Sequence, residues 1–135
     1  MLTVDAVDHL VINVTNVEAS AAWYARVLGM KRVDNPASGG HIRTSMMFGQ
    51  SKINLRPADF SQDLWFTGLV PAPGSDDICF LTQSTPDEVV RHFQDCGVEI
   101  VEGPTDKSGA LGRLCSVYIR DPDGNLIEVS SYIDC

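Results

Sequence analysis

The chain of 135 residues repeats a pattern of its first half in its second half, and this repeat strongly limits the folds it can adopt. The segment at 8–14, Asp-His-Leu-Val-Ile-Asn-Val, matches the segment at 76–82, Asp-Asp-Ile-Cys-Phe-Leu-Thr. His9 aligns with Asp77 and Gly29 aligns with Gly97, both at a separation of 68 residues. Near the end of each half, Ile-Asn-Leu at 53–55 resembles Ile-Glu-Val at 127–129. An internal repeat of this kind predicts two modules of similar structure.

Each half of the sequence indicates a strand, then a helix, then three strands. The first strand is expected over about 4–14, and the first helix over about 17–28, ending at Gly29. The second helix is expected to begin with a capping box formed by Thr85 and Glu88. We therefore predict an α+β protein of paired βαβββ modules.

We interpret residues 1–135 as a single domain with three parts: module one over about 1–57, a linker over 58–75 and module two over about 76–135. The linker is rich in Pro and Gly and carries Phe60, Trp65 and Phe66. These aromatic side chains have two explanations. They cover a site or a partner chain, or they pack against their own module.

Charge and composition exclude several classes of protein. A net charge of -8 and a sequence pI near 4.6 argue against nucleic acid as a partner. No apolar run reaches the ~20 residues of a membrane helix, so we expect no membrane partner. The first residues lack the basic and apolar regions of a signal peptide. We therefore expect a cytoplasmic protein whose four cysteines are reduced thiols.

Polar side chains occupy matched positions of the two modules. Strand alternation turns His9 and Asn54 of module one, and Asp77 and Glu128 of module two, away from the apolar residues beside them. Arg56 shares the face of Asn54, because it follows two residues later. A sheet with a helix on one face leaves its other face uncovered, so the two modules are expected to pair these faces into a cup.

Three segments identify a family resemblance. They are Asp-His-Leu at 8–10, Trp-Tyr at 23–24 with Leu-Gly-Met at 28–30, and Asp-Pro-Asp-Gly-Asn-Leu-Ile-Glu at 121–128. With them the chain resembles the vicinal oxygen chelate superfamily of glyoxalase I, fosfomycin-resistance proteins, bleomycin-binding proteins and extradiol dioxygenases. Within it, proteins of the glyoxalase domain-containing protein 5 type are the most similar. The resemblance implies a cup-shaped mixed sheet and a homodimer.

The resemblance also implies a metal site and an activity. The divalent ion, which is nickel, zinc, manganese, iron(II) or magnesium, would be held by His9, Asn54, Asp77 and Glu128. The implied activity is that of a glyoxalase I-like, lactoylglutathione lyase-type enzyme, acting on a small α-oxo compound or its thiol adduct, such as a glutathione adduct. Asp77 and Glu128 would be its catalytic carboxylates. Arg56 either holds an anionic group of the substrate or neutralises the acidic cup.

Two positions depart from the pattern of the superfamily. Asp77 stands where histidine is common, and Asn54 stands where glyoxalase I commonly has glutamate. These departures leave three alternatives open: a protein related to extradiol dioxygenases, a fosfomycin-resistance-type thiol transferase, and a non-catalytic binding protein of the bleomycin-resistance type.

Overall fold

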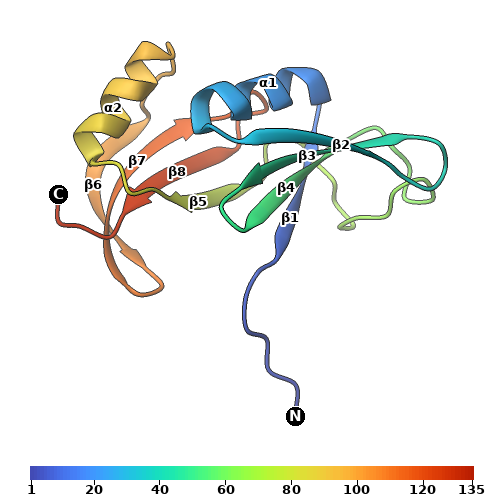
Figure 1. Cartoon of the computed structure of the whole chain (residues 1–135), viewed down its shortest axis with the longest axis horizontal. Coiled ribbons are helices and arrows are strands. Elements are labelled where there is room, and N and C mark those ends of the chain that lie inside the picture. The colour runs from blue at the N-terminus through green and yellow to red at the C-terminus, as the bar shows by residue number, and fades with distance from the viewer. The chain divides into compact units, whose positions relative to one another are not determined.

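The computed structural model describes all 135 residues and divides into two compact units, Met1–Pro73 and Gly74–Cys135. Each unit contains one helix and one four-stranded mixed sheet, in the order strand, helix, strand, strand, strand (Figure 1). The predicted α+β fold with two βαβββ modules is therefore confirmed. Neither helix has the length and apolar character that crossing a membrane requires.

The sheet of the first unit has the strand order β1-β4-β3-β2. β1 runs parallel to β4, and the other neighbours are antiparallel. Contacts with β2, β3 and β4 hold α1 on one face of this sheet. The elements are β1 (His9–Val14), α1 (Val17–Leu28), β2 (Lys31–Pro36), β3 (Ile42–Phe48) and β4 (Ser51–Pro57).

The second unit repeats this topology with the strand order β5-β8-β7-β6. The register repeats as well: Val11 pairs with Asn54 in the first unit, and Cys79 pairs with Glu128 at the equivalent place in the second. α2 contacts β6, β7 and β8. The elements are β5 (Asp77–Leu81), α2 (Pro86–Asp95), β6 (Glu102–Gly109), β7 (Gly112–Arg120) and β8 (Leu126–Ser131).

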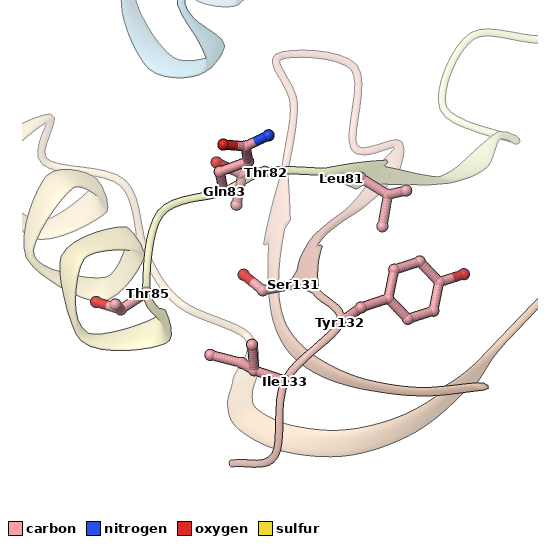
Figure 2. Close-up of a pocket in the computed structure, with 7 residues that line it drawn as sticks. All are labelled: Leu81, Thr82, Gln83, Thr85, Ser131, Tyr132 and Ile133. Atoms are coloured by element: carbon pink, nitrogen blue, oxygen red, sulfur yellow. The ribbon is translucent and has the colours of Figure 1, made fainter. Parts of the chain in front are cut away.

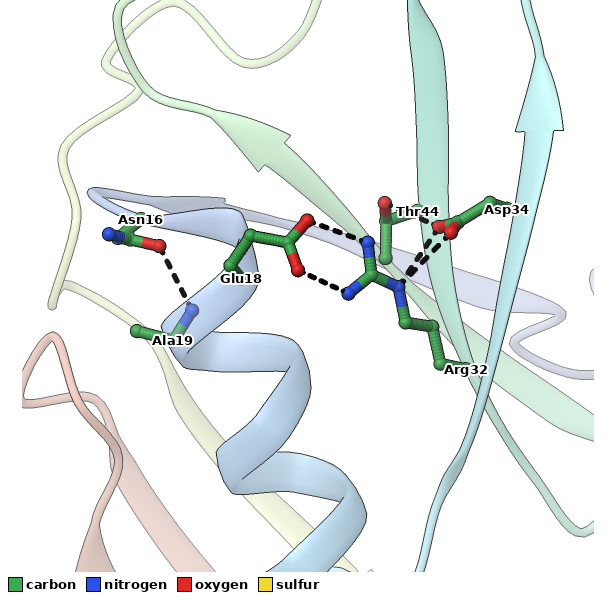
Figure 3. A network of polar contacts seen from close by, with 6 residues as sticks. All are labelled: Asn16, Glu18, Ala19, Arg32, Asp34 and Thr44. Atoms are coloured by element: carbon green, nitrogen blue, oxygen red, sulfur yellow. Dashed lines mark hydrogen bonds and ion pairs between the residues drawn. The ribbon is translucent and has the colours of Figure 1, made fainter.

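Local sequence signals account for both helices. The side chain of Asn16 accepts a hydrogen bond from the backbone of Ala19 and caps α1 (Figure 3). The helix ends at Gly29, which has a φ of 67°. The expected capping box of α2 is present, because Thr85 and Glu88 each accept from the other's backbone N–H. These caps satisfy N–H groups that have no partner within a helix.

An ion-pair network joins α1 to β2 and β3. The guanidinium of Arg32 donates to both carboxylate oxygens of Glu18, at 2.6 and 2.8 Å, and to Asp34 (Figure 3). Hydrogen bonding to Arg32 lowers the pKa of Glu18. The Thr44 hydroxyl, and then Arg32, lower the pKa of Asp34. The ionised carboxylate of Glu18 therefore ties the exposed start of the helix to the sheet, and Asp34 holds the Arg32 guanidinium in place for it.

Each apolar core lies between a helix and the covered face of its sheet. In the first unit, Ile12, Val14 and Ile53 from the strands and Tyr24 from the helix are almost fully buried. The core of the second unit likewise combines an aromatic side chain of the helix, Phe93, with aliphatic side chains of the strands, Val117, Ile119 and Ile127. Burial of these side chains is the main stabilising contribution. It leaves the residues on the opposite, helix-free face of each sheet for other roles.

Two expectations from the sequence are wrong. The first strand begins at His9 rather than near Val4, because its parallel partner β4 begins at Ser51 and offers no pairing before His9. Nor are all four cysteines reduced: Cys115 and Cys135 form a disulfide. Cys115 pairs with Ser131 across β7 and β8, so the chain end, four residues later, returns beside it.

Candidate functional site

His9 stands at the start of β1, with its side chain 43% exposed. Its Nδ1 donates to the carboxylate of Asp8 over 2.7 Å. A carboxylate on one ring nitrogen fixes the tautomer and orientation of an imidazole and leaves Nε2 for a ligand. The pair therefore has the arrangement that metal-binding histidines usually have.

Asn54 lies on the helix-free face of the first sheet and is buried. Its side-chain Oδ1 accepts a hydrogen bond of 2.7 Å from Ser45, the residue opposite it on β3. Beside this bond the surface is hollowed into a cavity of about 300 Å³, whose lining residues are Asp8, Val33, Asn35, Ser45, Met47, Gln50, Ser51 and Lys52. The partners of both His9 and Asn54 thus line one hollow.

Glu128 lies half-buried in the middle of the helix-free face of the second sheet, between Cys79 on β5 and Tyr118 on β7. Its Oε2 accepts from the hydroxyl of Ser116 at 2.6 Å and lies 3.1 Å from the hydroxyl oxygen of Ser130. Burial, followed by the neighbouring carboxylate of Glu128, raises the pKa of Tyr118 well above its usual range. The phenol therefore stays protonated beside this carboxylate at neutral pH.

Asp77 is exposed at the start of β5, two residues before Cys79 and on the same face of the strand. Burial is the main cause that raises the pKa of the Cys79 thiol, and the charges of Glu128 and Asp77 add to it. Both predicted carboxylates of the second unit therefore act electrostatically on one side chain.

The structure places two of the four predicted ligands in each unit. His9 and Asn54 belong to the first unit, and Asp77 and Glu128 belong to the second. No group of three or more His, Cys, Asp or Glu side chains is positioned to hold a metal ion. The donor groups of the four predicted ligands, one imidazole, two carboxylates and an amide oxygen, are of the types that bind a divalent ion of intermediate to hard character.

Arg56 is fully buried, and its guanidinium is engaged within the first unit. Its nitrogens donate to the carbonyl oxygens of Trp65 and Phe60, at 2.9 and 2.6 Å, and to the side chain of Asn13 at 2.9 Å. Trp65 itself is 4% exposed and lies under the guanidinium of Arg43. Arg56 thus fastens the first part of the predicted linker to its own module, and its role in substrate binding stays a prediction.

A larger cavity, of about 590 Å³, lies in the second unit beside the last residues of the chain (Figure 2). Its lining residues are Leu81, Thr82, Gln83, Thr85, Ser131, Tyr132 and Ile133. None of them was predicted as a site residue. One signal for it was present in the sequence: an apolar pair, Tyr132 and Ile133, follows directly after the last predicted strand.

Sequence reasoning also missed the two serines that contact Glu128. Ser116 is 0% exposed and Ser130 is 1% exposed, although both carry a hydroxyl. The alternation of the strands places them on the face of Glu128, since Ser130 lies two residues from it and pairs with Ser116. A small polar residue on this face was therefore the available signal.

These features define a class of protein. The chain belongs to the Glyoxalase/Bleomycin resistance protein/Dioxygenase superfamily, whose family model matches residues 6–129. The resemblance seen in the sequence is thereby confirmed. Members of this superfamily often use divalent metal ions.

Particular relatives are similar over almost the whole chain. Virulence protein STM3117 of Salmonella typhimurium is 40% identical over 134 residues, which are 98% of this chain and 88% of that protein. Its crystal structure superposes with a TM-score of 0.86. Glyoxalase domain-containing protein RDO1 of Mycosarcoma maydis is 41% identical over 98% of this chain and 72% of its own length. Lactoylglutathione lyase of Agrobacterium tumefaciens, 22% identical with a TM-score of 0.72 over 96% of each chain, is similar in fold alone.

Proposed function

We propose that the protein is a divalent-metal-dependent enzyme of the glyoxalase I type, which acts on a small α-oxo compound or its thiol adduct. The observation that carries the proposal is the position of Glu128, a half-buried carboxylate held by hydrogen bonds on the helix-free face of a sheet. A carboxylate kept in this way is placed for chemistry rather than for solubility. Family membership supports the same conclusion.

We propose His9, Asp77 and Glu128 as the metal ligands, with Asn54 as a weaker donor. The Asp8 carboxylate on His9 Nδ1 supports the histidine, because it leaves Nε2 to face a ligand. The bond from Ser45 occupies one lone pair of Asn54 Oδ1, which makes the amide the weakest of the four. When bound, a divalent ion supplies Lewis acidity towards the oxygens of the substrate.

The proton transfer is assigned to the carboxylates of the second unit. Glu128 or Asp77 removes the proton from the carbon next to the carbonyl group and returns it to the neighbouring carbon, which isomerises the substrate. Tyr118, whose phenol stays protonated, offers a hydrogen-bond donor beside Glu128.

Together with this function we propose that the protein forms a homodimer. Size-exclusion chromatography with light scattering measures the oligomeric state.

The test of this proposal is turnover of methylglyoxal with glutathione by protein loaded in turn with Ni²⁺, Zn²⁺, Mn²⁺ and Mg²⁺. We expect thioester formation, followed by absorbance, with at least one metal and its loss in Glu128→Gln. Ser131→Ala, a change on the covered face of the same strand, is the matched control and should retain the activity. No thioester with any of the metals would refute the proposal. Oxygen consumption with a catechol would instead indicate a dioxygenase.

One observation favours a second candidate, a non-catalytic protein that binds a small molecule. The side-chain oxygen of Asn54 already accepts one hydrogen bond, so the position that commonly supplies a carboxylate to glyoxalase I contributes no charge and only one remaining lone pair. This candidate predicts tight binding of an apolar ligand without metal. Fluorescence titration of metal-free protein with the apolar probe N-phenyl-1-naphthylamine distinguishes it from the enzyme.

A further inference from the structure

The hydroxyls of Ser116 and Ser130 form, with Glu128 and Cys79, a continuous row of short polar contacts in the second unit. Ser116 Oγ lies 2.6 Å from Glu128 Oε2 and 2.7 Å from Ser130 Oγ. Ser130 Oγ lies 3.1 Å from the same carboxylate oxygen and 3.4 Å from Cys79 Sγ. All four residues come from the three adjacent strands β5, β8 and β7.

The number of hydrogens determines the direction of these bonds. Each serine hydroxyl has one hydrogen to donate, and an ionised carboxylate only accepts. Both short contacts, at 2.6 and 2.7 Å, need a hydrogen between their oxygens. Both receive one in a single arrangement, in which Ser116 donates to Glu128 and Ser130 donates to Ser116. The thiol of Cys79 then donates to Ser130, which has an acceptor lone pair left.

The two serine hydroxyls are buried, so each depends on its hydrogen-bond partners within the protein. Ser116 and Ser130 are 0% and 1% exposed, so water does not replace a lost partner. A buried hydroxyl without a hydrogen-bond partner destabilises the fold. Here the ionised carboxylate of Glu128 accepts the last hydrogen bond of the row, so both hydroxyls have partners. The carboxylate in turn is held at Oε2 by Ser116 directly and by Ser130 through Ser116.

We propose that Ser116 and Ser130 are positioning residues, which hold the carboxylate of Glu128 in the orientation that binds a ligand. The hydrogen bonds all run in one direction: Cys79 donates to Ser130, Ser130 donates to Ser116, and Ser116 donates to Glu128. This inference rests on the proposed function, since it assigns Glu128 to a divalent metal ion. Neither serine is proposed as a ligand of the ion. Both act through the carboxylate, as partners of metal ligands generally do.

The first test measures Mn²⁺ affinity by the electron paramagnetic resonance signal of the free ion. We expect Ser116→Ala and Ser130→Ala to weaken binding about 10-fold or more. The matched control is Ser131→Ala, which removes another buried hydroxyl from β8, the strand of Ser130, that donates to the backbone carbonyl of Ser84 instead. We expect this control to bind Mn²⁺ within about twofold of the wild type.

The outcomes separate this inference from the proposed function. If Glu128→Gln loses Mn²⁺ binding while both serine variants retain it, the positioning role is overturned and the proposed function stands. If Glu128→Gln binds Mn²⁺ as the wild type does, or if the wild type binds none, the proposed metal site is overturned and the positioning role with it.

A second test needs no metal. In urea unfolding followed by circular dichroism, Ser116→Ala and Glu128→Ala together should shift the midpoint by less than the sum of the two single shifts, because each removes the same bond. Ser131→Ala combined with Glu128→Ala should be additive. Additivity in the first pair would show that Ser116 does not act through Glu128 and would overturn the inference.

Discussion

Replacing Arg56 by methionine should destabilise the first unit severely, because the side chain is buried and several polar acceptors lose their hydrogen-bond donor with it. The substitution keeps an apolar stem of similar length but removes three bonds of 2.6–2.9 Å, to Trp65, Phe60 and Asn13. The acceptors left behind, two backbone carbonyls and one amide, lie in a part-buried or buried environment. A further pair of longer contacts, at 3.3 Å, reaches two more carbonyl oxygens of the same segment.

The magnitude follows from these bonds. A hydrogen bond to a charged group contributes roughly 1.5–3 kcal/mol, and a buried acceptor left without its partner costs roughly 1–3 kcal/mol. With three such bonds lost, we expect Arg56→Met to lower the free energy of unfolding by about 4 kcal/mol. With a urea dependence of roughly 2 kcal/mol per M, the midpoint shifts down by about 2 M.

Tryptophan fluorescence reports on this unit specifically, since both tryptophans of the chain, Trp23 and Trp65, belong to it. Trp65 is 4% exposed, so its emission should move to longer wavelength when the segment detaches. Arg113→Met, a change at an exposed ion pair, is the control and should shift the midpoint little. If Arg56→Met leaves the urea midpoint and the emission wavelength unchanged, Arg56 does not fasten the linker. The result would then favour a role of its guanidinium in ligand binding.

Three further predictions concern other parts of the molecule. Both ring nitrogens of His41 are buried without a hydrogen-bond partner, and the ring contacts Phe60 and Trp65. His41→Phe should therefore raise the free energy of unfolding by about 1 kcal/mol. A free energy of unfolding below that of the wild type in urea titration would contradict this. Hydrogen bonding to Arg32 lowers the pKa of Glu18, and Thr44 followed by Arg32 lowers the pKa of Asp34, so these contacts add stability above pH about 4.5 that is lost as the pH falls through the folded pKa values. Arg32→Met should flatten this part of the pH–stability curve, and an unchanged curve would contradict it. Alkylation of unreduced, denatured protein should label two thiols rather than four, and Cys135→Ser should lower the stability of the second unit by about 3 kcal/mol; four labelled thiols would exclude the disulfide.

Much of the fold could be predicted because it depends on short-range patterns. The helix at 17–28 has the predicted bounds, since Asn16 and Gly29 terminate it through local hydrogen bonding and backbone conformation. The alignment of His9 with Asp77 and of Asn54 with Glu128 predicted equivalent places in two sheets of equal topology. Strand alternation was sufficient to place each of these residues on a face.

What could not be predicted depends on contacts between residues far apart in the sequence. The disulfide forms because Cys115 and Cys135 meet across the pairing of β7 with β8. The partners of Arg56 come from a linker whose path the sequence does not specify. The serines beside Glu128 are ordinary strand residues until the register of β7 against β8 brings them together.

The metal content of the native protein tests the central claim most directly. Elemental analysis of the wild type beside His9→Ala and Glu128→Ala should find about one divalent ion per chain in the wild type and a strong loss in both variants. Equal metal content in all three proteins would contradict the assignment of His9 and Glu128 as ligands.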